Sequence, residues 1–184
     1  DNGNTKSVVN YNHSDLHTKV QKWYLNGQTK LVANYNNTLQ SNVVEYYDNG
    51  KKKKEFLYQE GAIANTIVWE YYDNGNTKSV VNYNHNDHAI KVEAWYENNQ
   101  PKLIEHYIGG SKDGRLYRWY ENGQEKERSM YINGVKEGDS EERYENGQKK
   151  SQKSYLHGEF HGRWNEWYEN GQMKIEENFI RGVR

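Results

Sequence analysis

Aromatic and apolar residues recur along the chain in short alternating segments that flank an Asn-Gly pair. We number each copy from its turn residue, so that position −3 lies three residues before it. The turn residues of the eight copies are Gly3, Gly27, Gly50, Gly75, Asn99, Gly123, Gly147 and Gly171. Their spacings are 24, 23, 25, 24, 24, 24 and 24 residues. This regularity predicts one repeat domain over residues 1–184, with no linker.

The recurring side chains fit a period of two, which is typical of β-strands. Tyr stands at position −3, an aromatic residue at +8 and, in most copies, an apolar residue at −7. Asn-Gly between such segments is a strong hairpin signal, because a two-residue type I′ turn needs positive φ at both residues. The pattern therefore predicts an all-β fold: an elongated, single-layer, twisted antiparallel meander of about seven to eight stacked 24-residue β-hairpins.

A second connection follows the aromatic residue at +8. In the C-terminal half it reads Gly-x-x-x-Gly, as in Gly110/Gly114, Gly134/Gly138 and Gly158/Gly162. The N-terminal half lacks most of these glycines, so we expect its loops to be less regular. Two strands from each copy make a meander of about fifteen strands.

A two-residue turn would fix the register and place the aromatic residue at −4 opposite the lysine at +3. Such pairs let the lysine stem lie across the ring. The candidate binding face consists of Trp23, Tyr46, Tyr71, Trp95, Trp119 and Trp167 with Lys30, Lys53, Lys78, Lys102, Lys126, Lys150 and Lys174. The opposite face carries positions −3, −7 and +8 and is the predicted core. Because residues that recur in every copy are chiefly what a repeat needs to fold, a structural role for the aromatic–lysine row stays open.

Composition narrows the function. Only 33% of the residues are hydrophobic and the mean hydropathy is −1.30, yet 17 Tyr and 6 Trp supply apolar area, which suits a thin, aromatic-rich sheet. The formal net charge of −1 does not favour binding to nucleic acid. Without cysteine there is no disulfide or thiolate site. The compartment stays open between the cytoplasm and export with a leader outside this sequence.

No catalytic motif is present, and we expect no enzyme, cofactor or metal site. The pairs His13/His17, His85/His88 and His157/His161 fall in or beside predicted loops, where a third metal ligand would have to converge. The acidic residues at −2 repeat along the turns, whereas acid–base catalysis needs two carboxyl groups in unlike environments.

The repeat unit resembles the MORN-repeat variant found in many bacterial proteins. The residues that carry the resemblance are Y-Y-[DE]-N-G-Q-x-K-x4-Y-x2-G-x3-G, best matched from Trp95 onward and in WYENGQEKERSMYINGVKEG. The resemblance implies that the protein is bacterial and that it folds as a single-layer sheet of stacked hairpins. It also implies a binding scaffold, since some bacterial members are labelled antitoxins. It supplies no catalytic residues.

Three functions therefore remain open. The first is binding of a protein partner through the sheet surface, in the manner of an antitoxin or immunity protein. The second is a cell-surface or membrane-associated scaffold that binds lipid headgroups or glycans through the aromatic–lysine face. The third is edge-to-edge self-association through open strands.

Overall fold

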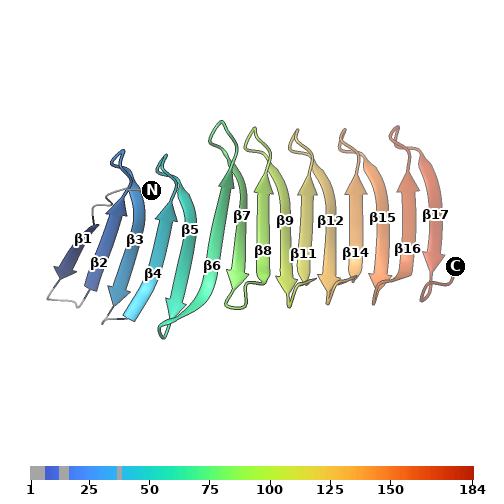
Figure 1. The fold of residues 1–184 in the computed structure, drawn as a ribbon. Helices are drawn as coiled ribbons and strands as arrows, with labels where there is room; N and C mark the ends of the chain where they lie inside the picture. The colour runs from blue at the N-terminus through green and yellow to red at the C-terminus, as the bar shows by residue number, and fades with distance from the viewer. Residues whose placement is uncertain (1–6, 13–16, 37–38) are drawn as a thin grey trace. The chain divides into compact units, whose positions relative to one another are not determined.

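The computed structural model describes residues 7–12, 17–36 and 39–184, and over these residues it contains strands and no helix. The all-β prediction and the antiparallel hairpin meander are confirmed (Figure 1). The strands are β1 (Ser7–Asn12), β2 (His17–Trp23), β3 (Thr29–Asn36), β4 (Leu39–Tyr46), β5 (Lys52–Gln59), β6 (Ala62–Tyr71), β7 (Thr77–Asn84), β8 (Ala89–Trp95), β9 (Pro101–Ile108), β10 (Ser111–Lys112), β11 (Gly114–Trp119), β12 (Glu125–Ile132), β13 (Val135–Lys136), β14 (Gly138–Arg143), β15 (Lys149–Leu156), β16 (Glu159–Trp167) and β17 (Met173–Phe179).

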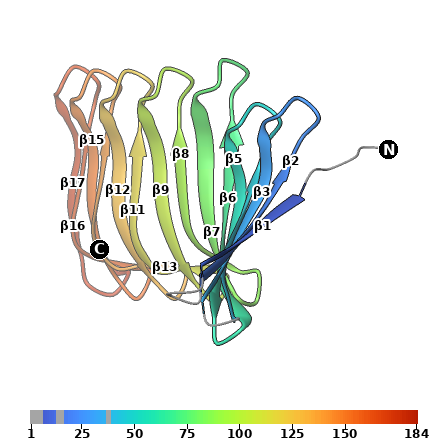
Figure 2. The same ribbon diagram turned by 90° about the vertical axis from the view of Figure 1, so that its left-hand side faces the viewer.

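Contacts divide the chain into two compact units. Unit 1 comprises residues 1–70 and 80–88, and unit 2 comprises residues 71–79 and 89–184. Within unit 2 the strands from β8 to β17 follow one another in chain order, and no segment of that unit covers either face of the sheet (Figures 1 and 2). The prediction of one domain over residues 1–184 stays a prediction.

The Asn-Gly turns differ from the predicted geometry. At Asn122-Gly123 the Gly123 amide donates to the Tyr120 carbonyl at 3.0 Å, and the Tyr120 amide donates to the Gln124 carbonyl at 2.9 Å. Gly123 has φ +86°, whereas Asn122 is not among the residues with positive φ. The loop is therefore a three-residue type I turn followed by a left-handed residue that forms a bulge. Asn99 fills the left-handed position in its copy with φ 66°.

The two-residue turns occur at the other ends of the strands instead. Glu60-Gly61, Gly109-Gly110, Asn133-Gly134 and His157-Gly158 all have positive φ at both positions, as a type I′ turn requires. A bulge follows at Asp113-Gly114 and at Glu137-Gly138, and it separates the two-residue strands β10 and β13 from β11 and β14. These interruptions account for the seventeen strands of the described residues, where about fifteen were predicted. In unit 1, Glu60-Gly61 is as regular as its counterparts in unit 2, and the loops at 13–16 and 37–38 lie outside the described residues.

The face with positions −7 and +8 is filled, as predicted. Leu116 at −7 is 2% exposed and Phe179 at +8 is 8% exposed. Few apolar side chains are buried among the described residues: Ala33, Val43, Val44, Leu116 and Phe179. Buried polar residues outnumber them and include Glu105, Glu127, Ser129 and Ser140. We call this side of the sheet the filled face and the other side the open face.

Contacts between successive repeats run through the octet that contains Asn-Gly. In unit 2 the hydroxyls of Tyr72, Tyr96, Tyr120 and Tyr144 each donate to the carbonyl at position −4 of the next repeat, at 2.8 to 2.9 Å. The amide of Asn122 donates to the carbonyl of Glu145 at 3.0 Å, and its oxygen accepts from the Gln124 amide at 2.9 Å. The repeated octet is therefore a clamp between neighbouring repeats, and this explains why it recurs.

Candidate protein-binding surface

The predicted pairing of the −4 aromatic residue with the +3 lysine is wrong. Trp119 lies opposite Glu125 at position +2, because the register shifts between Arg118 and Trp119. The same shift places Trp95 opposite Pro101 and Trp167 opposite Met173. The three-residue turn inserts one residue into the strand that follows it, and this extra residue displaces the lysine.

The +3 lysines lie over the tyrosines at −3 instead. The distance from the lysine Nζ to the ring centroid is 5.1 Å for Lys126 over Tyr120 and 5.3 Å for Lys102 over Tyr96. Lys30, Lys53 and Lys174 lie in the same way over Tyr24, Tyr47 and Tyr168. Lys174 also forms an ion pair with Glu166 at 3.6 Å, and Lys150 forms one with Glu142 at 3.4 Å. These lysines support the turn and do not join the tryptophan row.

The −4 aromatic residues belong to the open face. Trp119 stacks on Tyr117 with ring centroids 5.8 Å apart, and Tyr117 alternates with the buried Leu116 of the filled face. Trp23, Tyr46, Tyr71, Trp95 and Trp167 are half-buried, as is Trp119. Arg143 takes the −4 position in one copy and forms an ion pair with Glu141. A binding role for this row stays a prediction.

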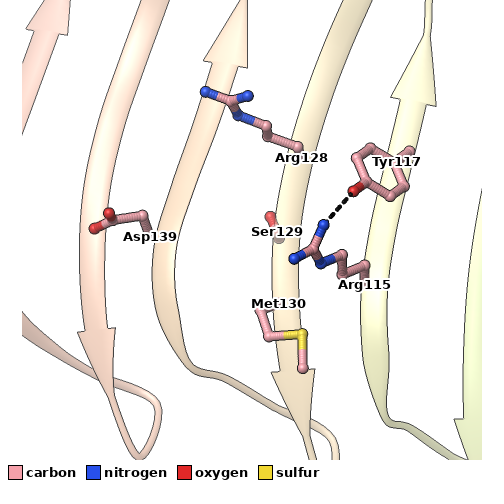
Figure 3. Close-up of a pocket in the computed structure, with 6 residues that line it drawn as sticks. All are labelled: Arg115, Tyr117, Arg128, Ser129, Met130 and Asp139. Atoms are coloured by element: carbon pink, nitrogen blue, oxygen red, sulfur yellow. Dashed lines mark hydrogen bonds between the residues drawn. The ribbon is translucent and has the colours of Figure 1, made fainter.

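The open face of unit 2 carries a groove of about 410 Å³ between β11, β12 and β14 (Figure 3). Its lining residues are Arg115, Tyr117, Arg128, Ser129, Met130 and Asp139. One guanidinium nitrogen of Arg115 donates to the Tyr117 hydroxyl at 3.2 Å. Among the described residues no carboxylate forms an ion pair with Arg115, so most of its donors face solvent.

Arg128, by contrast, is fixed in place. Its guanidinium donates to Glu141 at 2.9 Å and lies 3.8 Å from Glu125. The hydrogen bond and the charge of Glu141 raise the Arg128 pKa above its ordinary value. Asp139 accepts a hydrogen bond from Ser154 at 2.5 Å. The groove therefore combines a braced arginine, an unbraced arginine, an aromatic ring and a methionine, all carried by strands.

The filled face of unit 2 holds a charged cluster that sequence reasoning missed. Glu105, 6% exposed, pairs with Lys112 at 2.7 Å and Arg118 at 3.3 Å, and Arg118 reaches Glu127 at 3.2 Å. Burial raises the Glu105 pKa, but the hydrogen bonds from Lys112 and Tyr107 and the charges of Lys112 and Arg118 outweigh it. The net pKa lies below its ordinary value. Burial and the hydrogen bond to Glu105 raise the pKa of Tyr107 to about 12.

A Ser–Lys arrangement lies beside this cluster. The hydroxyls of Ser129 and Ser140 are 2.8 Å apart, and Lys136 donates to Ser140 at 3.3 Å. A serine nucleophile would need a neutral lysine as its base. Lys136 is instead paired with Glu127 at 3.3 Å and lies 5.5 Å from the ring centroid of Tyr155. The arrangement serves packing, and it accounts for serine at −7 in this copy.

The described residues contain no group of three or more His, Asp and Glu side chains that could hold a metal ion. His157 lies 3.6 Å from Glu137, and His161 accepts a hydrogen bond from the Arg181 amide at 3.4 Å. His13 lies outside the described residues. No helix in the described part of the chain could serve as a membrane span.

The repeat geometry agrees with a comparison to known families. A family model described as "MORN repeat variant" matches the chain at residues 40–60, 68–85, 136–157 and 160–181. These four stretches are similar to MORN repeats, which are generally protein- or membrane-binding modules of a non-catalytic type. No curated protein matches the chain.

Proposed function

We propose that the chain is a non-enzymatic repeat module that binds a protein partner through the open face of unit 2. The observation that carries the proposal is the groove at Arg115, an arginine that stands beside Tyr117 and Met130 and forms no ion pair with any described residue. Arg, Tyr, Trp and Met are the residues enriched where protein interfaces are buried. The form of this function that the resemblance favours is neutralisation of a protein toxin.

The two faces differ in what they leave available. On the filled face the charged side chains satisfy one another, as in the cluster of Glu105, Arg118 and Glu127. On the open face Arg115 is exposed and only lightly held. A carboxylate of the partner would therefore form an ion pair with the Arg115 guanidinium. The guanidinium would lose bound water and would not have to break an existing ion pair. The stacked Tyr117 and Trp119 add rigid aromatic area beside it.

The test is capture of a partner from lysate of the source organism by immobilised wild-type and variant protein. We expect Arg115→Glu and Tyr117→Ala to lose at least tenfold in affinity for the captured protein, since each removes about 1.4 kcal/mol or more from a buried contact. Lys126→Glu makes the same charge change at a residue that does not line the groove and should bind as wild type does.

All variants are first compared with wild type in thermal unfolding, so that loss of binding is not loss of fold. A partner that binds wild type and Arg115→Glu equally, while Lys126→Glu weakens it, would refute the groove as the binding surface. Vesicle co-sedimentation of the same variants distinguishes the lipid-binding alternative, because binding to vesicles alone would contradict a protein partner.

A further inference from the structure

We infer that unit 1 contains an oxyanion site on the filled side of β2, β3, β4 and β5, suited to a phosphate monoester. The site is a pocket of about 260 Å³. Its lining residues are Lys22, Tyr24, Lys30, Leu31, Glu45, Tyr46 and Lys53. This inference does not rest on the proposed function, because the groove at Arg115 lies in unit 2.

The pocket gathers more positive than negative charge from the residues that line it. Three ammonium groups, of Lys22, Lys30 and Lys53, face one carboxylate, of Glu45. Within the described ranges none of the three lysines forms an ion pair. Lys30 lies over the ring of Tyr24 at 5.5 Å from the centroid, which holds its amino group at the pocket wall.

Comparison between repeats shows that this charge is a local departure from the pattern. In the last two repeats position −5 is glutamate, and Glu142 and Glu166 neutralise the lysines at +3, Lys150 and Lys174. In the repeat around Gly27 position −5 is Lys22 instead. The carboxylate that balances the +3 lysine in the last two repeats is therefore replaced here by a second ammonium group.

A basic residue at −5 is compensated where it occurs in unit 2. Arg118 lies between Glu105 and Glu127 and pairs with both. The cross-strand neighbours of Lys22 are Ser7 and Leu31, and neither carries a charge. Leu31 in turn lies opposite Glu45, so an apolar side chain separates the lysine from the nearest acid in that row of the sheet.

The donor set favours phosphate over carboxylate. Lysine ammonium groups act as compact point charges and suit a tetrahedral anion, whereas planar carboxylates are matched by the fork of arginine. The Tyr24 hydroxyl already donates to the Tyr46 carbonyl at 2.6 Å, so this phenol forms a wall and not a free donor. Pockets for drug-sized ligands usually have volumes of roughly 300 Å³ and above. The volume of this pocket, about 260 Å³, lies below that range and suits a single phosphate group with a short attached stem.

The experiment is an amide NMR titration with inorganic phosphate at constant ionic strength, chloride being the balancing salt. We expect saturable shifts at the amides of Lys22, Lys30 and Lys53 in wild type. Lys22→Glu restores the acid found at −5 in the last repeats and should weaken phosphate binding at least tenfold. Lys19→Glu is the matched control, since it makes the same charge change three residues earlier, on the opposite face of β2.

Lys22→Glu should also melt at the same or a higher temperature than wild type without phosphate, because an acid replaces a repelled lysine. This second readout shows that lost binding is not lost folding. Absence of saturation up to roughly 50 mM phosphate, or an equal response in wild type and Lys22→Glu, would overturn the site.

Vesicles of phosphatidylcholine with and without phosphatidic acid distinguish the source of the phosphate. Sedimentation that needs both phosphatidic acid and Lys22 indicates a lipid headgroup. Phosphate shifts without sedimentation indicate a soluble phosphate ester. Sedimentation that Lys22→Glu leaves unchanged counts against the site.

Discussion

The hydroxyl of Tyr120 provides the sharpest test of the clamp between repeats. It donates to the Arg143 carbonyl of the next repeat at 2.9 Å in a half-buried position. Tyr120→Phe keeps the ring and its contact with Lys126 and removes only this hydrogen bond. A hydrogen bond of this kind contributes about 1 kcal/mol, and the carbonyl left without its donor can raise the cost toward about 2 kcal/mol.

Tyr168 supplies a matched control at the same position of the last repeat. It is 51% exposed, and among the described residues its hydroxyl has no hydrogen-bond partner. Tyr168→Phe should therefore change the free energy of unfolding by a few tenths of a kcal/mol at most. The two substitutions are chemically identical, so their difference isolates the contact between repeats.

The assay is native-state hydrogen exchange, because stability in a stacked repeat protein is distributed over neighbouring repeats and one global midpoint can hide a local change. The amides of Gly123 and Gly147, which close the two turns that Tyr120 connects, are the reporters. We expect Tyr120→Phe to lower their protection by about 1 kcal/mol while Tyr168→Phe does not. Equal losses in the two variants, or none in Tyr120→Phe, would refute the clamp.

Two further predictions concern the turns and the charged cluster. Gly123→Val should destabilise its hairpin by about 1–3 kcal/mol, because φ is +86° and a Cβ would meet Gln100 at 2.9 Å. Asn99→Gly should be neutral or slightly stabilising. Equal thermal midpoints for wild type and Gly123→Val would contradict the turn geometry. Because the pKa of Glu105 is lowered in the folded state, its ionised carboxylate stabilises the fold at pH values above the unfolded pKa of 4.5. This stabilisation is lost as the pH falls through the folded pKa. The urea midpoint should therefore fall less steeply on acidification in Glu105→Gln than in wild type. The raised pKa of Tyr107 predicts the opposite pH dependence: between pH 10 and about 12 the stability of the fold should fall as the pH rises. Tyr107→Phe should remove this contribution to the pH dependence.

The strands could be predicted from the sequence because Asn-Gly and the aromatic alternation act locally. The register could not, because Asn-Gly fits both a two-residue turn and a three-residue turn with a bulge. The choice depends on the next repeat: Asn122 uses its amide to reach Glu145 while its oxygen accepts from Gln124. One extra residue in the loop then moved +3 lysines such as Lys102 and Lys126 from the −4 aromatic residue to the tyrosine at −3.

The candidate surface was predicted in part. The tryptophan row lies on the open face, separate from the lysines that were grouped with it. Arg115 and Arg128 carry no repeating signal, since positions −8 and +5 vary between copies, so a search for recurring residues passes over them. The buried Glu105 was missed because its partners, Lys112 and Arg118, come from the short strand β10 and from the next repeat.

The clamp gives the stack a polarity. In the copies around Gly75, Asn99, Gly123 and Gly147, the tyrosine hydroxyl and the asparagine side-chain amide both donate to the next repeat, and the accepting carbonyls belong to the same octet one copy later. Any copy therefore presents the same donors forward and the same acceptors backward, whatever its other residues are. Whole units become interchangeable parts, and a tandem duplication adds a copy that fits both of its neighbours at once. The identity of residues 1–13 and 73–85 is the kind of trace that such growth leaves in a sequence.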